Sequence, residues 1–261
     1  MKLENNQHVV QQQFGQSAAD YRDEPLFAEG SDLQWMVESM DLTGAERLLD
    51  IGTGAGHTCL AFAPLVADCV GLDVTPEMVQ VASGLVVDKG LTNVQFLQAE
   101  AEHLPFPDDA FDVVTCRFAA HHFIDVEQAM REVSRVLKAG GTFLLIDHYA
   151  PEARELDDFV NTLDRLRDPS HVREYSVAQW QSYFQNNGLS HTELRHWDLK
   201  LKFANWVKRA KTPARVQEQL TDLLVGATEA CKETFSVEIA DGHVQTFCLK
   251  CAFFRGTKAG E

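Results

Sequence analysis

The chain has 261 residues, of which 45% are hydrophobic, enough for one large α/β domain with a cap or for two small domains. Its formal net charge of −16 argues against nucleic acid or an anionic membrane as a partner, because both require clustered Lys and Arg. The N-terminus lacks a basic region followed by an apolar run, and no segment approaches the roughly 20 apolar residues of a membrane span. A cytoplasmic protein with small-molecule chemistry is expected.

Six cysteines are scattered, mostly within apolar runs, as is typical of buried thiols in a reducing compartment. Only Cys248 and Cys251 have a suggestive spacing. They fall in a predicted strand, where positions three apart point to opposite faces and cannot share a metal ion. Because there is no second Cys or His pair at zinc-like spacing, no metal site is expected.

From the N-terminus, a polar arm precedes an amphipathic helix over 26–40, whose apolar residues recur every three to four positions. Short apolar runs then alternate with helical patterns. Strands are predicted at 47–52, 68–74, 94–99, 111–116 and 142–150. Helices are predicted at 57–66, at 76–90 between Pro76 and Gly90, and after the N-cap Asp125. This alternation predicts a doubly wound, mostly parallel sheet that binds ligands at the carboxyl ends of its strands.

The pattern changes after residue 150. An amphipathic helix over 156–166 and a short helix with a capping box at Ser176 and Gln179 predict a helical lid insertion. Two long strands at 193–203 and 243–256, separated by a helical segment over 212–233, predict an antiparallel edge. The expected organisation is a single structural domain with four parts: arm and cap helix 1–40, core 41–150, lid and acceptor-binding insertion 151–190, and C-terminal strands 191–261.

Asp50 stands just before three glycines at alternate positions, Gly52, Gly54 and Gly56, in a predicted strand-to-helix turn. Glycine there allows positive φ and close approach of a ligand to backbone N–H groups. A dinucleotide fingerprint requires its third glycine at position 57, which is His57, so an NAD-dependent oxidoreductase is disfavoured.

Asp73 closes the next strand, where an acid accepts hydrogen bonds from the ribose hydroxyls of an adenosine-containing cofactor. The alternative is that Asp73 only caps the following helix, a role that Thr75 fills equally well. After the third strand, the Glu100 carboxylate can accept from an adenine amine and the Ala101 N–H can donate to a ring nitrogen, with Met78 on the ring face. The alternative makes Glu100 a solvated loop acid.

Four motifs occur in a fixed order: LLDIGTGAGH (48–57), GLDVTPEMV (71–79), AEAEHLPFPDDAFDVVTC (99–116) and REVSRVLKAGG (131–141). In these motifs the chain resembles class I S-adenosylmethionine (SAM)-dependent methyltransferases of the UbiE type, whose best-known members methylate quinone precursors at carbon. The resemblance covers about 14–149, including FGQSAADY, which is similar to the family's cap over the cofactor. It implies a Rossmann-like methyltransferase fold of seven strands with the last strand antiparallel.

The resemblance also implies SAM as the cofactor and assigns residues to it. Asp50 and the turn of Gly52, Gly54 and Gly56 hold the methionine end, and Asp73 holds the ribose. The remaining cofactor-binding residues are Val74 and Met78 beside the adenine, Glu100 and Ala101 at its edge, Arg117 near the sulfonium through its backbone carbonyl, and Tyr21 as the closing residue. The chain departs from the family pattern at Ala139, where a proline is usual, and at Glu100, where Asp or Asn is commoner.

Methyl transfer from a sulfonium is an in-line displacement that needs alignment and desolvation more than covalent help. A base is required only if the acceptor must lose a proton, as a phenol or an activated carbon acid does. His148 and His121, which follow the fifth and fourth strands, are the candidate catalytic residues, and the alternative for each is a structural role. Asp147 either orients an imidazole or satisfies a loop amide.

Two further groups of residues, one aromatic and one basic, each have two alternative roles. One forms either an acceptor pocket or core: Phe159, Trp180, Tyr183, Phe184, Trp197 and Trp206. The other binds an anionic acceptor or, as we favour, pairs with the lid's own acids: Arg165, Arg167, His171 and Arg173.

We therefore predict a SAM-dependent methyltransferase of a small-molecule acceptor, with C-methylation of an aromatic or quinone-like compound as the leading hypothesis. The alternatives are N- or O-methylation of a secondary metabolite and a SAM-binding module without transferase activity. A nucleic-acid methyltransferase is disfavoured by the charge and by CRFAAHHF in place of an Asn/Asp-Pro-Pro-Tyr/Phe-like stretch after the fourth strand. The sequence allows a homodimer without requiring one.

Overall fold

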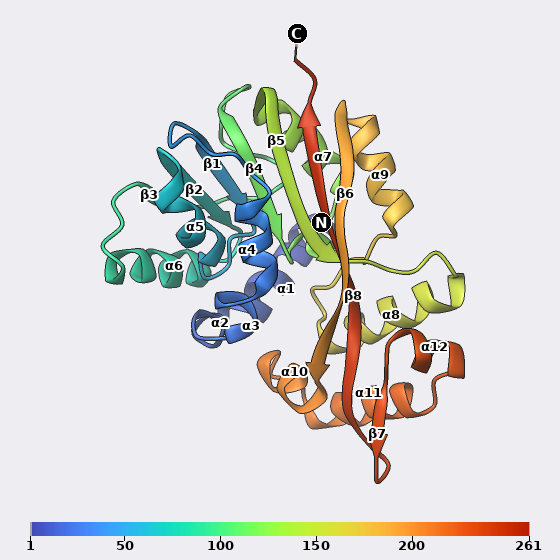
Figure 1. The fold of residues 1–261 in the computed structure, drawn as a ribbon. Helices are drawn as coiled ribbons and strands as arrows, with labels where there is room; N and C mark the ends of the chain where they lie inside the picture. Colours follow the sequence, from blue (N-terminus) through green and yellow to red (C-terminus); the bar gives the residue numbers. More distant parts are fainter. Residues whose placement is uncertain (1, 261) are drawn as a thin grey trace.

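The structure is a computed structural model that describes residues 2–260, and a central sheet runs through it with helices on both sides (Figure 1). The strands are β1 (Arg47–Ile51), β2 (Asp68–Asp73), β3 (Val94–Gln98), β4 (Phe111–Arg117), β5 (Leu137–His148), β6 (Leu189–Lys202), β7 (Glu238–Ala240) and β8 (His243–Lys258). The α-helices are α1 (Lys2–Gly15), α2 (Ala18–Arg22), α3 (Pro25–Ala28), α4 (Ser31–Glu38), α5 (His57–Phe62), α6 (Pro76–Asp88), α7 (Val126–Val136), α8 (Arg154–Arg167), α9 (Val177–Asn186), α10 (Phe203–Arg209), α11 (Ala214–Val225) and α12 (Glu229–Thr234).

The strand order is β3-β2-β1-β4-β5-β8-β6, which confirms the predicted doubly wound α/β fold. Strands β1 to β5 pair in parallel, and β8 is antiparallel to both β5 and β6. The short strand β7 pairs with β8 in addition to the seven strands predicted. Because the strand order reverses between β1 and β4, a crevice opens at their carboxyl ends, where α/β proteins bind ligands.

Successive residues of β1 point to opposite faces of the sheet, and each face has its own apolar cluster. Leu49 packs with Trp180 of α9 in one cluster. Leu48 packs in the other cluster with Met36 of α4 and Phe62 of α5. Both leucines have no exposed surface, as expected for a strand covered on both faces.

Strands β6 and β8 continue past the sheet and, with α8, α10, α11 and α12, form what we term the C-terminal lobe (Figure 1). A third apolar cluster fills it, centred on Trp206, Leu220, Phe235 and Phe247. The predicted antiparallel pairing of the C-terminal strands is confirmed. Within residues 2–260, none of the helices combines the length and the apolar character needed to cross a bilayer.

Two predicted helices are divided in the structure. The helix expected over 26–40 breaks at Gly30, where an added Cβ would lie 2.6 Å from the carbonyl oxygen of Leu26, so the turn between α3 and α4 is too tight for a side chain. The segment expected over 212–233 contains α11, which ends before Gly226, and α12, which Thr228 caps by accepting from the Cys231 N–H. The predicted capping box of α9 is confirmed.

Candidate active site

The glycine turn after β1 uses each of its three glycines differently. All three have positive φ: 67° at Gly52, 53° at Gly54 and 87° at Gly56. A Cβ on Gly52 would lie 2.4 Å from the side chain of Ala119, and one on Gly56 would lie 2.9 Å from the ring of Phe96. Only at Gly54 is there open space, with no atom within 4 Å of the added Cβ. Gly52 and Gly54 line a cavity along the carboxyl edge of the sheet, whereas Gly56 serves packing.

Asp73 joins this turn to the end of β2. One carboxylate oxygen accepts from the Gly54 N–H at 2.9 Å, and the other accepts from the Thr75 N–H at 2.9 Å. Asp73 lines the cavity with 9% of its surface exposed, and burial raises the pKa of its carboxyl. Each oxygen therefore keeps capacity to accept a further hydrogen bond from a ligand hydroxyl.

Asp50 lies beneath the turn and does not line the cavity. Its carboxylate accepts from the Thr115 hydroxyl at 2.7 Å and is 3.9 Å from the thiol of Cys59. Only 1% of Asp50 is exposed, and this burial raises the pKa of its carboxyl to about 6. Any effect of Asp50 on a ligand must therefore act through the turn above it.

The four residues predicted at an adenine lie together on one side of the cavity: Val74, Met78, Glu100 and Ala101. They follow the carboxyl ends of β2 and β3. Helix α1 closes over them, since the Gln11 side chain donates to the Val74 carbonyl at 2.9 Å. Glu100 also lies 3.4 Å from a ring nitrogen of His103 at the surface.

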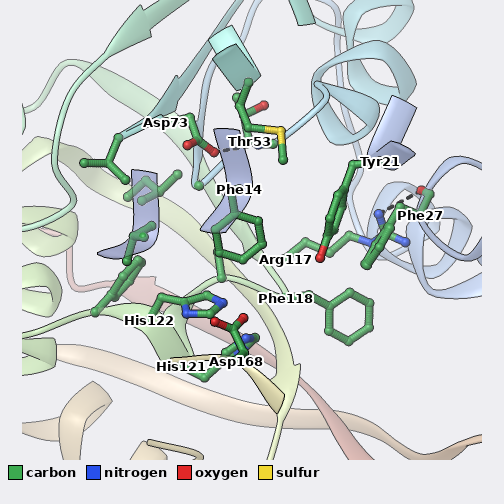
Figure 2. Close-up of a pocket in the computed structure, with 18 of the residues that line it drawn as sticks. Phe14, Tyr21, Phe27, Thr53, Asp73, Arg117, Phe118, His121, His122 and Asp168 are labelled. Atoms are coloured by element: carbon green, nitrogen blue, oxygen red, sulfur yellow. Dashed lines mark hydrogen bonds between the residues drawn. The ribbon is translucent and has the colours of Figure 1, made fainter. Parts of the chain in front are cut away.

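The N-terminal helices form a cap whose aromatic rings enter the cavity. Tyr21 stacks on Phe27 with ring centroids 5.1 Å apart. Phe14 lies edge-on to Tyr21 at 5.7 Å and to His122 at 5.0 Å. Figure 2 shows the Phe14 ring between Asp73 on one side of the cavity and the histidines on the other. The cap therefore contacts both ends of the cavity.

The Arg117 guanidinium fixes this cap to the end of β4. Its Nε donates to Asp32 at 2.5 Å, and one terminal nitrogen donates to the Phe27 carbonyl at 2.9 Å. Both side chains are almost fully buried, at 5% and 8% exposed. The sequence assigned Arg117 a role through its backbone carbonyl and missed its guanidinium, because Asp32 is 85 residues away in the chain.

At the other end of the cavity, buried Asp147 organises the two candidate catalytic histidines. Its carboxylate accepts from Nδ1 of His121 at 2.7 Å and from the backbone N–H of His148 at 2.8 Å. Although burial opposes it, the Asp147 charge raises the pKa of His121. Burial lowers the pKa of His148 to about 4, with the neighbouring His121 contributing. The two rings stack with centroids 5.4 Å apart, and both line the cavity.

Helix α8 and the loop after it bring further polar residues to this end. Asp164, Asp168 and His171 line the cavity, and Glu174 lies behind them without exposed surface. Burial lowers the pKa of His171 to about 3. The sequence analysis missed Asp164, Asp168 and Glu174. The available signal was the i, i+3, i+7 spacing of Asn161, Asp164 and Asp168, which places polar residues on the buried stripe of α8.

The open roles of the aromatic and basic groups are now settled in part. Of the six aromatic residues, only Trp206 lines the cavity, and Trp180 and Phe184 belong to the core. Arg173 pairs with the lid acid Asp157 at 2.7 Å, as favoured. Four more residues complete the wall of the cavity on the side of the C-terminal lobe: Leu199, Leu201, Arg209 and Leu249.

The fold and this cavity define a class I methyltransferase, with a glycine turn after β1 and an acid after β2. Residues 49–145 match the methyltransferase domain family. YcgJ, an uncharacterized methyltransferase of Bacillus subtilis, is 50% identical over 246 residues, which are 94% of this chain and 97% of that protein. Its crystal structure aligns with a TM-score of 0.87 at 49% identity, over 88% of this chain and 99% of the other.

A demethylmenaquinone methyltransferase of Thermus thermophilus is 38% identical over 131 residues, 48% of this chain and 59% of that protein. The chain therefore belongs to the SAM-dependent methyltransferase family, as its motifs predicted. SAM is the cofactor of this family.

Proposed function

We propose that the protein transfers the methyl group of SAM to a small aromatic acceptor, with carbon as the leading site of methylation. The observation that carries the proposal is one continuous cavity. It joins Asp73 and the glycine turn at one end to His121 and His148 at the other, beside the apolar wall of the C-terminal lobe. A cofactor and an acceptor bound in one cavity can meet without crossing solvent.

The cofactor end fits SAM. Asp73 keeps two oxygens able to accept from ribose hydroxyls, and Gly54 offers open space where a side chain would project. We assign the adenine to Val74, Met78, Glu100 and Ala101. The methionine end is assigned to the turn of Gly52 and Gly54 above Asp50, with Tyr21 and Arg117 closing the cap. When bound, SAM supplies an electrophilic methyl group.

His121 is the base that we assign to an acceptor that must lose a proton. Because the Asp147 carboxylate can only accept, Nδ1 of His121 carries the hydrogen, and Nε2 remains as the acceptor nitrogen of the neutral ring. Asp147 thus orients the imidazole as in other acid–base pairs. This arrangement suits a phenol or quinol, which is deprotonated as it is methylated at carbon or oxygen, better than an amine.

The acceptor end supports an apolar ring. Leu199 and Leu201 of β6, Leu249 of β8 and the Trp206 indole line it, so a planar hydrophobic body displaces water there at little cost. The similarity to a demethylmenaquinone methyltransferase supports the same class of acceptor.

The experiment is a turnover assay with SAM and a panel of 1,4-naphthohydroquinone, substituted phenols and aromatic amines. S-adenosylhomocysteine (SAH) formation is measured, and mass spectrometry with NMR locates the new methyl group. We expect a C-methylated hydroquinone. His121→Asn should lower kcat by about 100-fold while the SAH affinity is retained, and His243→Asn, at an exposed position away from the cavity, is the matched control. SAH binding without turnover on any acceptor would favour the non-catalytic module, and a methylated amine would overturn the assignment.

A further inference from the structure

Two buried carboxylates next to the cavity lack hydrogen-bond partners. Among the residues that the structure describes, neither oxygen of Glu174 has a donor, and one oxygen of Asp164 has none. Glu174 has no exposed surface, and Asp164 is 6% exposed. A buried carboxylate without donors costs several kcal/mol unless its charge is balanced. The pair therefore requires a positively charged or proton-bearing occupant.

His148 completes a group of three around this point. Its Nδ1 lies 3.6 Å from a carboxylate oxygen of Glu174. One ligand atom from each of His148, Asp164 and Glu174 lies within 4.8 Å of the other two. One imidazole nitrogen and two carboxylates are a common ligand set for a divalent metal ion.

Two nearby arginines make their hydrogen bonds to groups other than this carboxylate pair. Arg173 pairs with Asp157 at 2.7 Å. Arg167 donates its Nε to the Trp206 carbonyl at 3.2 Å and lies over the Trp206 ring. Neither guanidinium is hydrogen-bonded to Glu174 among the described residues. Arg167 acts on Asp164 through its charge, and its buried Nη2 has no hydrogen-bond partner among the described residues, so this guanidinium offsets part of the charge of the pair without bonding to it.

Hydrogen bonds hold the backbone of Glu174 and His148 in place. Asn161, on the same helix as Asp164, accepts from the Glu174 N–H at 2.8 Å and donates to the Glu174 carbonyl at 3.2 Å. His148 ends β5, where its backbone N–H is bonded to Asp147. Hydrogen bonds from residues behind the ligands orient metal ligands in proteins in this way.

We propose that His148, Asp164 and Glu174 bind one divalent transition-metal ion at the acceptor end of the cavity. Ligand bonds of about 2.1 Å keep two ligand atoms no more than about 4.2 Å apart, so binding draws the three side chains slightly together. Three protein ligands leave coordination positions open, and His148 and Asp164 face the cavity. If the proposed function holds, an acceptor oxygen occupies one of these positions.

The sequence predicted no metal site because it holds no second Cys or His pair at zinc-like spacing. The proposed ligands come from a strand end, a helix and a loop, and no short motif contains them. The competing occupant is a proton shared between Asp164 and Glu174. The same burial and charge repulsion that favour a cation also raise the pKa of Glu174 far above its usual range.

Metal binding is measured on the full-length protein after chelator treatment, without any methyl acceptor. Co²⁺ is titrated while visible d–d absorption and heat are followed, and metal content is measured by mass spectrometry after Zn²⁺ or Mn²⁺ loading. We expect about one equivalent of Co²⁺, bound at least about 10-fold more weakly by Glu174→Gln and by His148→Gln. Asp168→Asn, a buried acid on the same side of the cavity, is the matched control and should bind Co²⁺ as the wild type does.

Each outcome decides the proposal. Wild-type protein that takes up no Co²⁺, Zn²⁺ or Mn²⁺ overturns it and leaves the shared proton. Binding that His121→Asn weakens but Glu174→Gln leaves unchanged also overturns it, because His121, Asp147 and His148 form a second group of the same size. If Glu174→Gln does not fold, Asp164→Asn provides the test, because His148 belongs to both groups and Asp164 only to the proposed one. Metal uptake is independent of turnover, so its failure is distinct from failure of the proposed reaction.

Discussion

The carboxylate of Asp73 accepts a hydrogen bond from the backbone N–H of Gly54 at 2.9 Å, across 19 positions of sequence. This contact joins the ends of β1 and β2 at the rim of the cavity. The acid therefore holds the glycine turn in place while its remaining acceptor capacity faces the ligand. The Asp73 side chain thus both stabilises the turn and is placed to bind a ligand.

Replacing Asp73 with Asn should weaken SAH binding by roughly 10- to 150-fold, because the uncharged amide has one accepting oxygen in place of two, so that one hydrogen bond from the ribose is lost and the other is weakened. Calorimetric titration measures the loss. Asp88→Asn, which breaks only an exposed ion pair with Arg22, should leave the affinity unchanged. Equal affinity of the Asp73 variant and the wild type would rule out the ribose assignment.

Gly54→Ala should abolish most SAH binding at a modest cost in stability. The positive φ of 53° costs an alanine about 1–2 kcal/mol, and the new methyl group would project into open space in the cavity. Gly90 is the matched control, since it has φ of 68° and equally open surroundings but lies outside the cavity. Both variants should lose similar free energy of unfolding in urea, and only Gly54→Ala should lose affinity. A parallel loss in both would show that strain alone is responsible.

Asp50→Asn should make the protein more stable at neutral pH. The folded pKa of about 6 lies above the unfolded value near 3.9, so the native state holds a proton that the unfolded chain releases. Stability from Asp50 is therefore full below pH 4, falls as pH rises to 6 and stays low above it. The shift corresponds to about 3 kcal/mol at pH 7.

The measurement is the free energy of unfolding of Asp50→Asn and wild type between pH 4 and 7. The amide can still accept from Thr115, so the advantage of the variant should grow across this range. Asp41→Asn, at an exposed position, should give a flat difference. An advantage that shrinks with rising pH would contradict the burial argument.

Arg117→Met should destabilise the protein by about 3–5 kcal/mol, because it leaves Asp32 buried without its cation. Asp32→Asn in the same chain should restore part of this loss, and urea denaturation of the four proteins of the double-mutant cycle measures the coupling. Limited proteolysis should also cut the cap faster in Arg117→Met. Additive losses, with no recovery in the double variant, would mean that the ion pair is not what anchors the cap.

Local sequence patterns predicted the fold because the residues that mark the start of its helices and the apolar runs of its strands lie within the elements themselves. Pro76 begins α6, Asp125 accepts from the Gln128 N–H at the start of α7, and the alternation of apolar runs fixes the strand count of the parallel part. Gly30 shows the limit of such patterns: the apolar spacing continues across it, but the backbone there is extended, with φ of −61° and ψ of 135°, in a turn that leaves no room for a side chain.

Most of the residues that the sequence assigned to a cofactor line the cavity, whereas the acidic residues at the other end of the cavity were not predicted. Asp73 and Gly54 belong to motifs with regular spacing after adjacent strands, so sequence order brings them together. Asp164 and Glu174 approach His148 only because α8 folds back over the end of β5. No motif near either acid in the sequence predicts that contact. The sequence signal is limited to polar residues on the buried face of α8.

Strand β8 has one end in the sheet and the other in the C-terminal lobe. Cys251 and Ala252 pair with His148 and Asp147 at the end of β5, while Phe247 packs in the lobe's own cluster. The lobe is thus not an exchangeable module, because the strand β8 that runs through it also pairs with β5 and β6 in the sheet. Heating should therefore melt the sheet and the C-terminal lobe in a single cooperative transition.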